Sequence, residues 1–185
     1  MEEIIQQIGI EMAKKIYRRV EEGGLSDIDQ FATDTLEFCK DSAREIIRQF
    51  AKQLNGEFRA DKAYRREQGL IMKEKDRERS LLTEIGLITI QRDYYMSKVN
   101  NEYVCPIDDM LGIASYERVS ANLSARMVGQ AAEVSYEKSA RIESGGRVSK
   151  QTVKNKLLAA GRLEKEMPKE KRTVSELHIF ADEDH

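Results

Sequence analysis

Tryptophan is absent from this 185-residue chain, and aromatic residues make up only 6% of it. So few large rings agree with small helical cores rather than one large globule. Only two prolines occur, Pro106 and Pro168, so long uninterrupted helices are allowed. No apolar run approaches the ~20 residues that a membrane-spanning helix needs, and the acidic start Met1-Glu2-Glu3 does not resemble a secretory signal. We therefore expect a cytoplasmic protein with no membrane partner.

Cysteine and histidine are also scarce, with two of each. Cys39 and Cys105 lie far apart in apolar surroundings, which favours two buried thiols over a disulfide or a metal pair. His178 and His185 lack a metal-ligand spacing such as His-x-x-x-His. The chain contains no P-loop, no Gly-x-Gly-x-x-Gly and no recognisable nucleophile motif, so none of these sites is indicated.

Positive charge is concentrated towards the C-terminus. The whole chain has a net charge of -2, but residues 135–173 contain eleven Lys or Arg and five Asp or Glu, a net charge of +6. The remainder therefore carries -8. A basic segment in an acidic chain is a candidate phosphate-binding surface, although on charge alone a solvated helix face is the better explanation.

Residues 1–57 predict a helical hairpin. In residues 3–21 apolar side chains recur every four positions, and Gly23-Gly24 ends that helix. Ser26 suits the N-cap of a longer helix over residues 27–55, which we expect Asn55-Gly56 to interrupt. Two helices make a thin core, so we expect a homo-oligomer that forms through the apolar faces. The alternative is that these helices pack on the rest of the same chain.

The spacing of apolar residues changes from a helical to a strand-like period in the middle of the chain. Residues 58–79 are rich in charge and predict a helical extension or a linker. In residues 80–113 the alternation of Ile88 and Ile90 with polar neighbours is typical of a strand. Turn residues on both sides then predict a small three-stranded antiparallel sheet, which Pro106 ends. The expected fold class is therefore α+β, mainly α.

Residues 114–163 predict three helices that begin at serine N-caps, namely Ser120, Ser135 and Ser149. Gly145-Gly146 separates the last two, as in a helix-turn-helix. Lys, Gln and Asn at the start of the final helix suit phosphates and base edges. An ordinary packed corner between two helices is the alternative. The predicted DNA-binding residues are Lys150, Gln151, Lys154 and Asn155, with Arg147 and Lys156 on phosphates.

The last residues predict a linker at 164–174 and one strand at 175–185. In a strand, Asp182 and Asp184 would face one way and Glu183 and His185 the other. A carboxylate on a buried strand is how magnesium-dependent phosphoryl-transfer sites begin. From these four residues alone, an acidic tail on a truncated chain is the better explanation.

The order of several blocks resembles bacterial insertion-sequence transposases of the ISLre type, which are relatives of the Mutator-like transposases. Arg79-Ser80-Leu81-Leu82-Thr83-Glu84-Ile85-Gly86 and Arg92-Asp93-Tyr94-Tyr95 are similar to that family's "R-x-L-L-T-x-x-G … R-x-Y-Y" block. The resemblance continues through three later blocks, Tyr103 to Asp108, Val148 to Val153 and Leu177 to Asp182.

The resemblance implies a DNA-binding helical part and an RNase H-like catalytic domain whose three acidic residues bind Mg²⁺ or Mn²⁺. Only Asp182 falls on a catalytic and metal-binding position, with Asp184 as a register-shifted rival. The second aspartate and the glutamate have no counterpart in the chain. We therefore expect a DDE-type enzyme that is inactive as this chain alone and binds no metal by itself.

The expected function is that of the N-terminal part of a transposase, which recognises the element ends in double-stranded DNA. The catalytic domain would be mostly missing, and the protein would be cytoplasmic, associated with the nucleoid when bound to DNA. A helical self-association module that does not bind DNA is the alternative. A complete enzyme is a third possibility.

Overall fold

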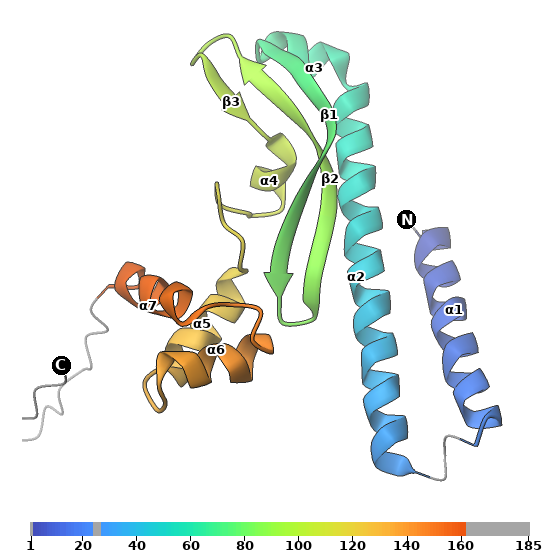
Figure 1. Ribbon diagram of the computed structural model, residues 1–185. Coiled ribbons are helices and arrows are strands. Elements are labelled where there is room, and N and C mark those ends of the chain that lie inside the picture. Colours follow the sequence, from blue (N-terminus) through green and yellow to red (C-terminus); the bar gives the residue numbers. More distant parts are fainter. Residues whose placement is uncertain (1, 24–26, 162–185) are drawn as a thin grey trace, which may run out of the picture.

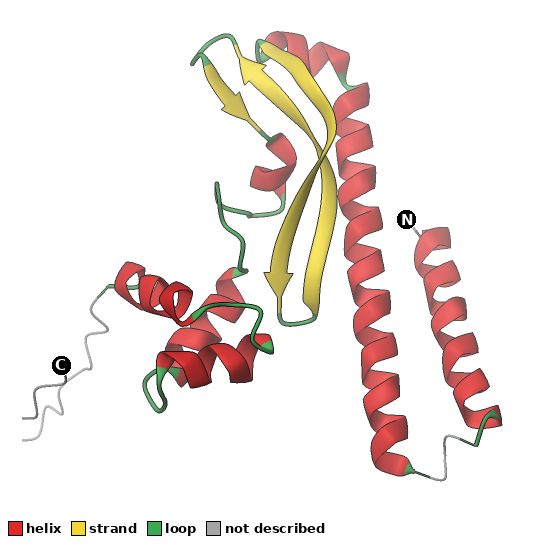
Figure 2. Ribbon diagram, viewed as in Figure 1, coloured by secondary structure: helices red, strands yellow, loops and turns green. Residues whose placement is uncertain are grey.

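The computed structural model describes residues 2–23 and 27–161, and the predicted linker at 164–174 and the terminal strand with Asp182 and Asp184 lie outside these residues. The described fold is α+β and mainly α, as the sequence predicts (Figures 1 and 2). Its elements are α1 (Glu2–Glu21), α2 (Ile28–Ala60), α3 (Lys62–Glu67), β1 (Leu70–Thr83), β2 (Gly86–Ser97), β3 (Glu102–Val104), α4 (Pro106–Met110), α5 (Ala121–Gln130), α6 (Tyr136–Ser144) and α7 (Lys150–Ala159).

The helices α1 and α2 form the predicted hairpin and run side by side (Figure 1). No residue of α1 is buried, so this hairpin encloses little core. The N-cap of α2 is Asp27 rather than the predicted Ser26, and its side chain accepts a hydrogen bond from the backbone N–H of Gln30. An ion pair between Arg19 and Asp34, at 2.6 Å, joins the two helices.

The predicted interruption of α2 at Asn55-Gly56 is wrong, because the helix continues to Ala60. Asn55 is buried against β2, where its amide oxygen accepts a hydrogen bond from the backbone N–H of Asp93 at 2.9 Å. Asparagine disfavours helices because it forms competing local hydrogen bonds. Here the side chain of Asn55 forms its hydrogen bond with a strand instead. It therefore does not compete for the backbone hydrogen bonds of its own helix.

The predicted helix or linker at 58–79 is also wrong over its second half, because β1 begins at Leu70. β1 pairs with β2 along nearly its whole length, with irregularities between Met72 and Arg77. β3 pairs with the end of β2, which gives the predicted three-stranded antiparallel sheet in the order β1-β2-β3. Pro106 ends the sheet and begins α4.

A buried carboxylate joins α2 to the sheet. Arg59 of α2 donates hydrogen bonds to both oxygens of Asp93 on β2, at 2.6 and 2.7 Å. Asn55, the backbone N–H of Asp76 and the hydroxyl of Tyr95 also donate to this carboxylate, which is 0% exposed. Burial alone would raise the pKa of Asp93, but the hydrogen bond from Arg59 and the others outweigh it and lower this pKa.

A second carboxylate joins the sheet to the segment that precedes α5. Asp108 of α4 lies 2.5 Å from Arg92 and 3.1 Å from Arg79. Arg79 also donates to the carbonyl oxygens of Ala114 and Glu117, at 2.7 and 2.8 Å. Burial raises the pKa of Asp108 in spite of the two guanidinium groups. These contacts fix the course of the chain between α4 and α5.

The environments of the two cysteines differ from the expectation. Both thiols are free, but Cys39 is exposed rather than buried, and Cys105 is partly buried. Burial raises the pKa of the Cys105 thiol, which lowers its reactivity. No helix within residues 2–23 and 27–161 is long and apolar enough to cross a membrane.

Replacement of Asp93 by alanine should destabilise the fold by roughly 3–5 kcal/mol, because the polar groups of α2 and β1 lose a buried partner. Urea unfolding followed by circular dichroism measures this change. Asp76→Asn is the matched control, since Asp76 binds the same guanidinium but is half exposed, and it should cost less than about 1 kcal/mol. Equal effects of the two substitutions would contradict a dominant role for Asp93.

Candidate nucleic-acid interface

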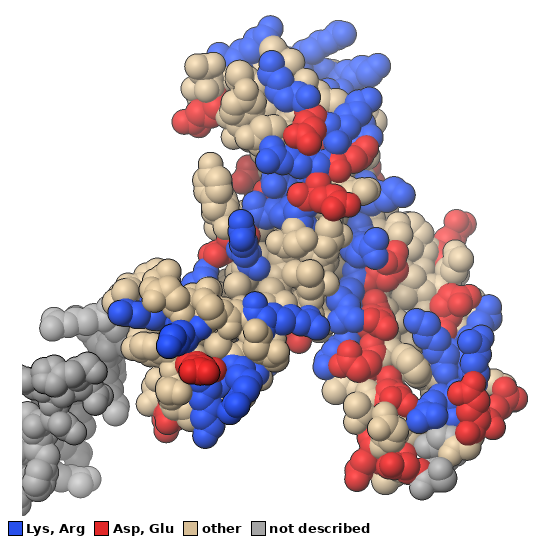
Figure 3. Space-filling view, in the orientation of Figure 1, with Lys and Arg blue, Asp and Glu red and all other residues tan. Residues whose placement is uncertain are grey.

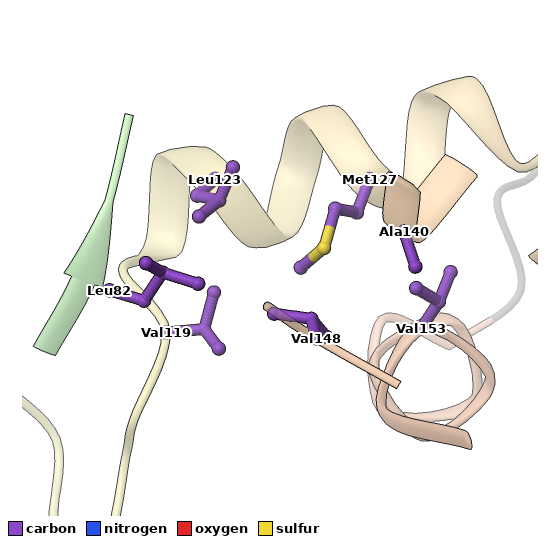
Figure 4. Packing of buried hydrophobic residues seen from close by; sticks show 7 residues of the cluster. All are labelled: Leu82, Val119, Leu123, Met127, Ala140, Val148 and Val153. Atoms are coloured by element: carbon purple, nitrogen blue, oxygen red, sulfur yellow. The ribbon is translucent and has the colours of Figure 1, made fainter. Parts of the chain in front are cut away.

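The helices α5, α6 and α7 share one apolar core (Figure 4). Its side chains come from β1, from the segment before α5, from each of the three helices and from the turn between α6 and α7. The buried members are Leu82, Val119, Leu123, Met127, Ala140, Val148 and Val153. We call residues 117–161, together with Leu82, the three-helix unit.

Serine side chains fix the ends of these helices. Ser120, Ser135 and Ser149 are the N-caps of α5, α6 and α7, as predicted, and each accepts a hydrogen bond from a backbone N–H three residues further on. The buried Ser144 donates to the carbonyl oxygen of Ala140 at 2.6 Å and accepts from the N–H of Val148 at 3.1 Å. These bonds hold the turn between α6 and α7.

That turn needs its glycines. Gly145 and Gly146 have φ angles of 62° and 78°, in the left-handed region that side chains with a Cβ rarely adopt. Gly145 ends α6, and four residues later Ser149 caps α7. The predicted helix–turn–helix arrangement of two helices is therefore present, with α5 packed against both.

Leu82 anchors the three-helix unit to the sheet. The backbone N–H of Leu82 donates to the carbonyl oxygen of Arg118, and its own carbonyl accepts from the N–H of Ser120, both at 2.8 Å. Its side chain is 7% exposed within the core of the unit. The end of β1 is thus shared between the sheet and the helices.

Four of the predicted DNA-binding side chains lie on one exposed face of α7. At about 100° per residue, Lys150 and Lys154 form one row, and Gln151 and Asn155 form the next. All four are exposed. Val153, on the opposite side of the helix, is 0% exposed. Gln151 donates to the side-chain oxygen of Asn155 at 2.9 Å, which aligns the two amides along the helix.

The other two predicted residues do not join this face. Lys156 projects to the opposite side, where its amino group lies 2.5 Å from the carboxylate of Glu117. Its charge is therefore already paired inside the unit. Arg147 is exposed, but its guanidinium lies beside Gly86, the first residue of β2. The sequence gives the spacing of residues along α7, but it does not show that Glu117 and Gly86 lie beside Lys156 and Arg147.

Two cations of α6 were missed by the sequence prediction. Lys138 and Arg141 are exposed, and Arg141 and Lys150 line a shallow depression of about 370 Å³ at the start of α7. Residues 135–161 carry six Lys or Arg against two acids, and this excess was the signal available in the sequence. Figure 3 shows several basic side chains on the visible face of the three-helix unit.

No metal centre is found within residues 2–23 and 27–161, where no three His, Cys, Asp or Glu side chains are grouped to hold an ion. The predicted catalytic Asp182 and its rival Asp184 lie outside these residues. The exposed side chains of α7 have the chemistry that contacts phosphates and base edges, and the residues that the structure describes assign no catalytic step.

The fold and this surface define an α+β protein with a helix-turn-helix-like unit. A family model described as "Uncharacterised protein family (UPF0236)" matches residues 7–185, so the chain belongs to the UPF0236 family. Three UPF0236 proteins of Caldanaerobacter subterraneus subsp. tengcongensis are 38%, 37% and 36% identical to it over 143 residues. These matches cover 77% of this chain and 30% of each relative, so the chain spans about 30% of their length. No solved structure matches it significantly.

Replacement of Leu82 by alanine should lower the free energy of unfolding by about 2–4 kcal/mol, because it leaves a cavity in the shared core. Leu87 is the matched control, since it faces Leu82 across the hairpin but is 53% exposed. Leu87→Ala should change the stability by less than about 0.5 kcal/mol. Urea unfolding measures both, and a Leu82→Ala protein as stable as the control would show that the sheet does not support the helices.

Proposed function

We propose that the chain is a DNA-binding part of an ISLre-type insertion-sequence transposase, in which α7 lies in the major groove at the element ends. The observation that carries the proposal is the exposed α7 face of Lys150, Gln151, Lys154 and Asn155 above a buried Val153. Lysine neutralises phosphates, while the amide of Gln or Asn can form two hydrogen bonds with the edge of adenine. The capped N-terminus of α7 adds a partial positive charge.

The copy number of the relatives supports the mobile-element part of this proposal. One of the relatives is named for eleven loci of a single genome, and another for four. Many gene copies of one protein in a single genome are typical of elements that move. The order of sequence blocks from Arg79 to Asp182 supports the same family assignment.

We propose cleavage of a DNA strand only for a protein that is longer than this chain. Such a site needs several carboxylates around Mg²⁺ or Mn²⁺, which would stabilise the attacking and leaving oxygens. Asp182 is the proposed first carboxylate, and the described residues 2–23 and 27–161 provide no grouped partners for it. We therefore assign DNA recognition, and no chemistry, to the described residues.

Binding of the 185-residue protein to a fluorescent duplex from the ends of its own genetic element tests the proposal. The affinity should fall as salt rises, with a slope of about −0.9 per neutralised phosphate in a plot of log K against log salt. The element end should be preferred at least about ten-fold over a shuffled duplex of equal composition. Binding that ignores salt, or equal affinity for both duplexes, would contradict the proposal.

Lys154 and Lys156 lie two residues apart on α7, but their surroundings differ. Lys154→Gln should reduce the magnitude of the salt slope by about one unit, because Lys154 is free to contact a phosphate. Lys156→Gln is the matched control and should leave the slope unchanged, because Lys156 pairs with Glu117. Circular dichroism checks that both variants fold. A smaller salt slope in Lys156→Gln alone would contradict the proposal, because it would place the phosphate contacts on the opposite side of α7.

A further inference from the structure

The longest helix has an apolar face that nothing in the described part of the chain covers. Six residues of α2 follow a heptad pattern, with one row at spacings of seven from Leu36 and another from Ala32. Most of them are exposed, and none is buried. We call this set the α2 seam, and its members are Ala32, Leu36, Cys39, Ala43, Ile46 and Phe50.

The α2 seam is a third face of the helix. At about 100° per residue, it lies roughly 120° around α2 from each of two other rows. One row contains Asp34 and Phe38, which contact Arg19 and Lys15 of α1. The other contains the buried Ala51 and faces the sheet. Figure 1 shows α1 and the β1–β2 hairpin on different sides of α2.

The exposed apolar area beside α2 approaches that of a specific interface. Ile28, Leu36, Ile47 and Phe50 on or beside the seam are 67%, 55%, 37% and 43% exposed. At roughly 150–250 Å² for a large side chain, these fractions amount to about 400 Å² of apolar surface. Two such patches facing each other remove about 800 Å², and the flanking side chains bring the total close to the ~1,000 Å² that a specific interface needs.

We propose that the α2 seam is a homodimer interface, in which α2 of a second copy packs antiparallel against it. An antiparallel pair centred near residue 41 is self-complementary in volume, since Ala32 faces Phe50 and Leu36 faces Ile46 of the other copy. The small Cys39 and Ala43 meet at the centre, where the two backbones approach most closely. A parallel pair would instead place Phe50 against Phe50 and Ala32 against Ala32.

The charges beside the seam permit this pairing. The positions that flank it are Thr33, Thr35, Lys40, Ser42, Ile47 and Gln49, and only one of them is charged. Lys40 is already paired with Glu37 of its own helix, at 2.7 Å. In an antiparallel pair centred near residue 41, the two copies of Lys40 lie near each other across the two-fold axis, and the bond of each Lys40 to its own Glu37 offsets their repulsion. The antiparallel helix dipoles favour the pair. Since α1 lies beside each α2, the dimer is a four-helix arrangement.

Sedimentation equilibrium of the 185-residue protein, without DNA, tests the interface. The wild type should be dimeric at tens of micromolar, and Leu36→Glu should be monomeric, with an affinity at least about 100-fold weaker. Leu87→Glu is the matched control, because Leu87 is 53% exposed on the sheet against 55% for Leu36, and it should remain dimeric. Thermal unfolding confirms that both variants are folded. A monomeric wild type, or a Leu36→Glu protein that still forms the dimer, would overturn the proposal, whatever the outcome of DNA binding.

Disulfide cross-linking tests the antiparallel direction. One chain carries Cys105→Ala and keeps Cys39, and a second carries Cys105→Ala, Cys39→Ala and Ala43→Cys. Under mild oxidation, a mixture of the two chains should form covalent dimers, because residues 39 and 43 face each other. Either chain alone should not, since its two thiols are displaced by a further ~6 Å along the axis, beyond disulfide reach. Cross-linking of the first chain with itself, or none in the mixture, would overturn the antiparallel arrangement.

Discussion

The burial of Leu82 between the sheet and three short helices is the contact on which the position of α7 depends. Helices of nine or ten residues are marginal by themselves, and their stability comes from the apolar side that they bury. Here the side chain of Leu82 from β1 covers that apolar side, and the backbone of Leu82 pairs with the segment before α5. With the apolar side fixed in this way, the polar side of α7 faces solvent.

Buried charge, rather than a large apolar core, fixes the rest of the molecule. Asp93 connects α2 with both long strands, and Asp108 connects the sheet with the chain that leads to α5. A buried ion pair adds little net stability but strongly penalises its own disruption. Such contacts therefore specify geometry, which a protein with small separate cores needs. They connect α2 to the sheet, and the sheet to the segment that precedes α5.

The sequence predicted the elements whose signals are local. Serine caps and paired glycines gave the limits of α6 and the start of α7 to within about one residue, and the alternation around Ile88 gave β2. The first half of β1 was missed because its apolar run, Leu70 to Met72, is short and is followed by charged residues from Lys73 to Arg79, and its pairing with β2 makes it a strand. The contacts of Asn55 and Lys156 could not be predicted for the same reason. Their partners, Asp93 and Glu117, lie 38 and 39 residues away in the sequence, where a local pattern gives no information.

Nuclear magnetic resonance of the backbone amide groups tests the recognition of DNA by α7 most directly. On titration with an element-end duplex, the largest chemical-shift changes should fall on Lys150, Gln151, Lys154 and Asn155, with small changes at the core residue Val153 and on α1. Changes concentrated on the α1–α2 hairpin, with α7 unaffected, would contradict it. They would leave the three-helix unit as a packed corner with no part in DNA binding.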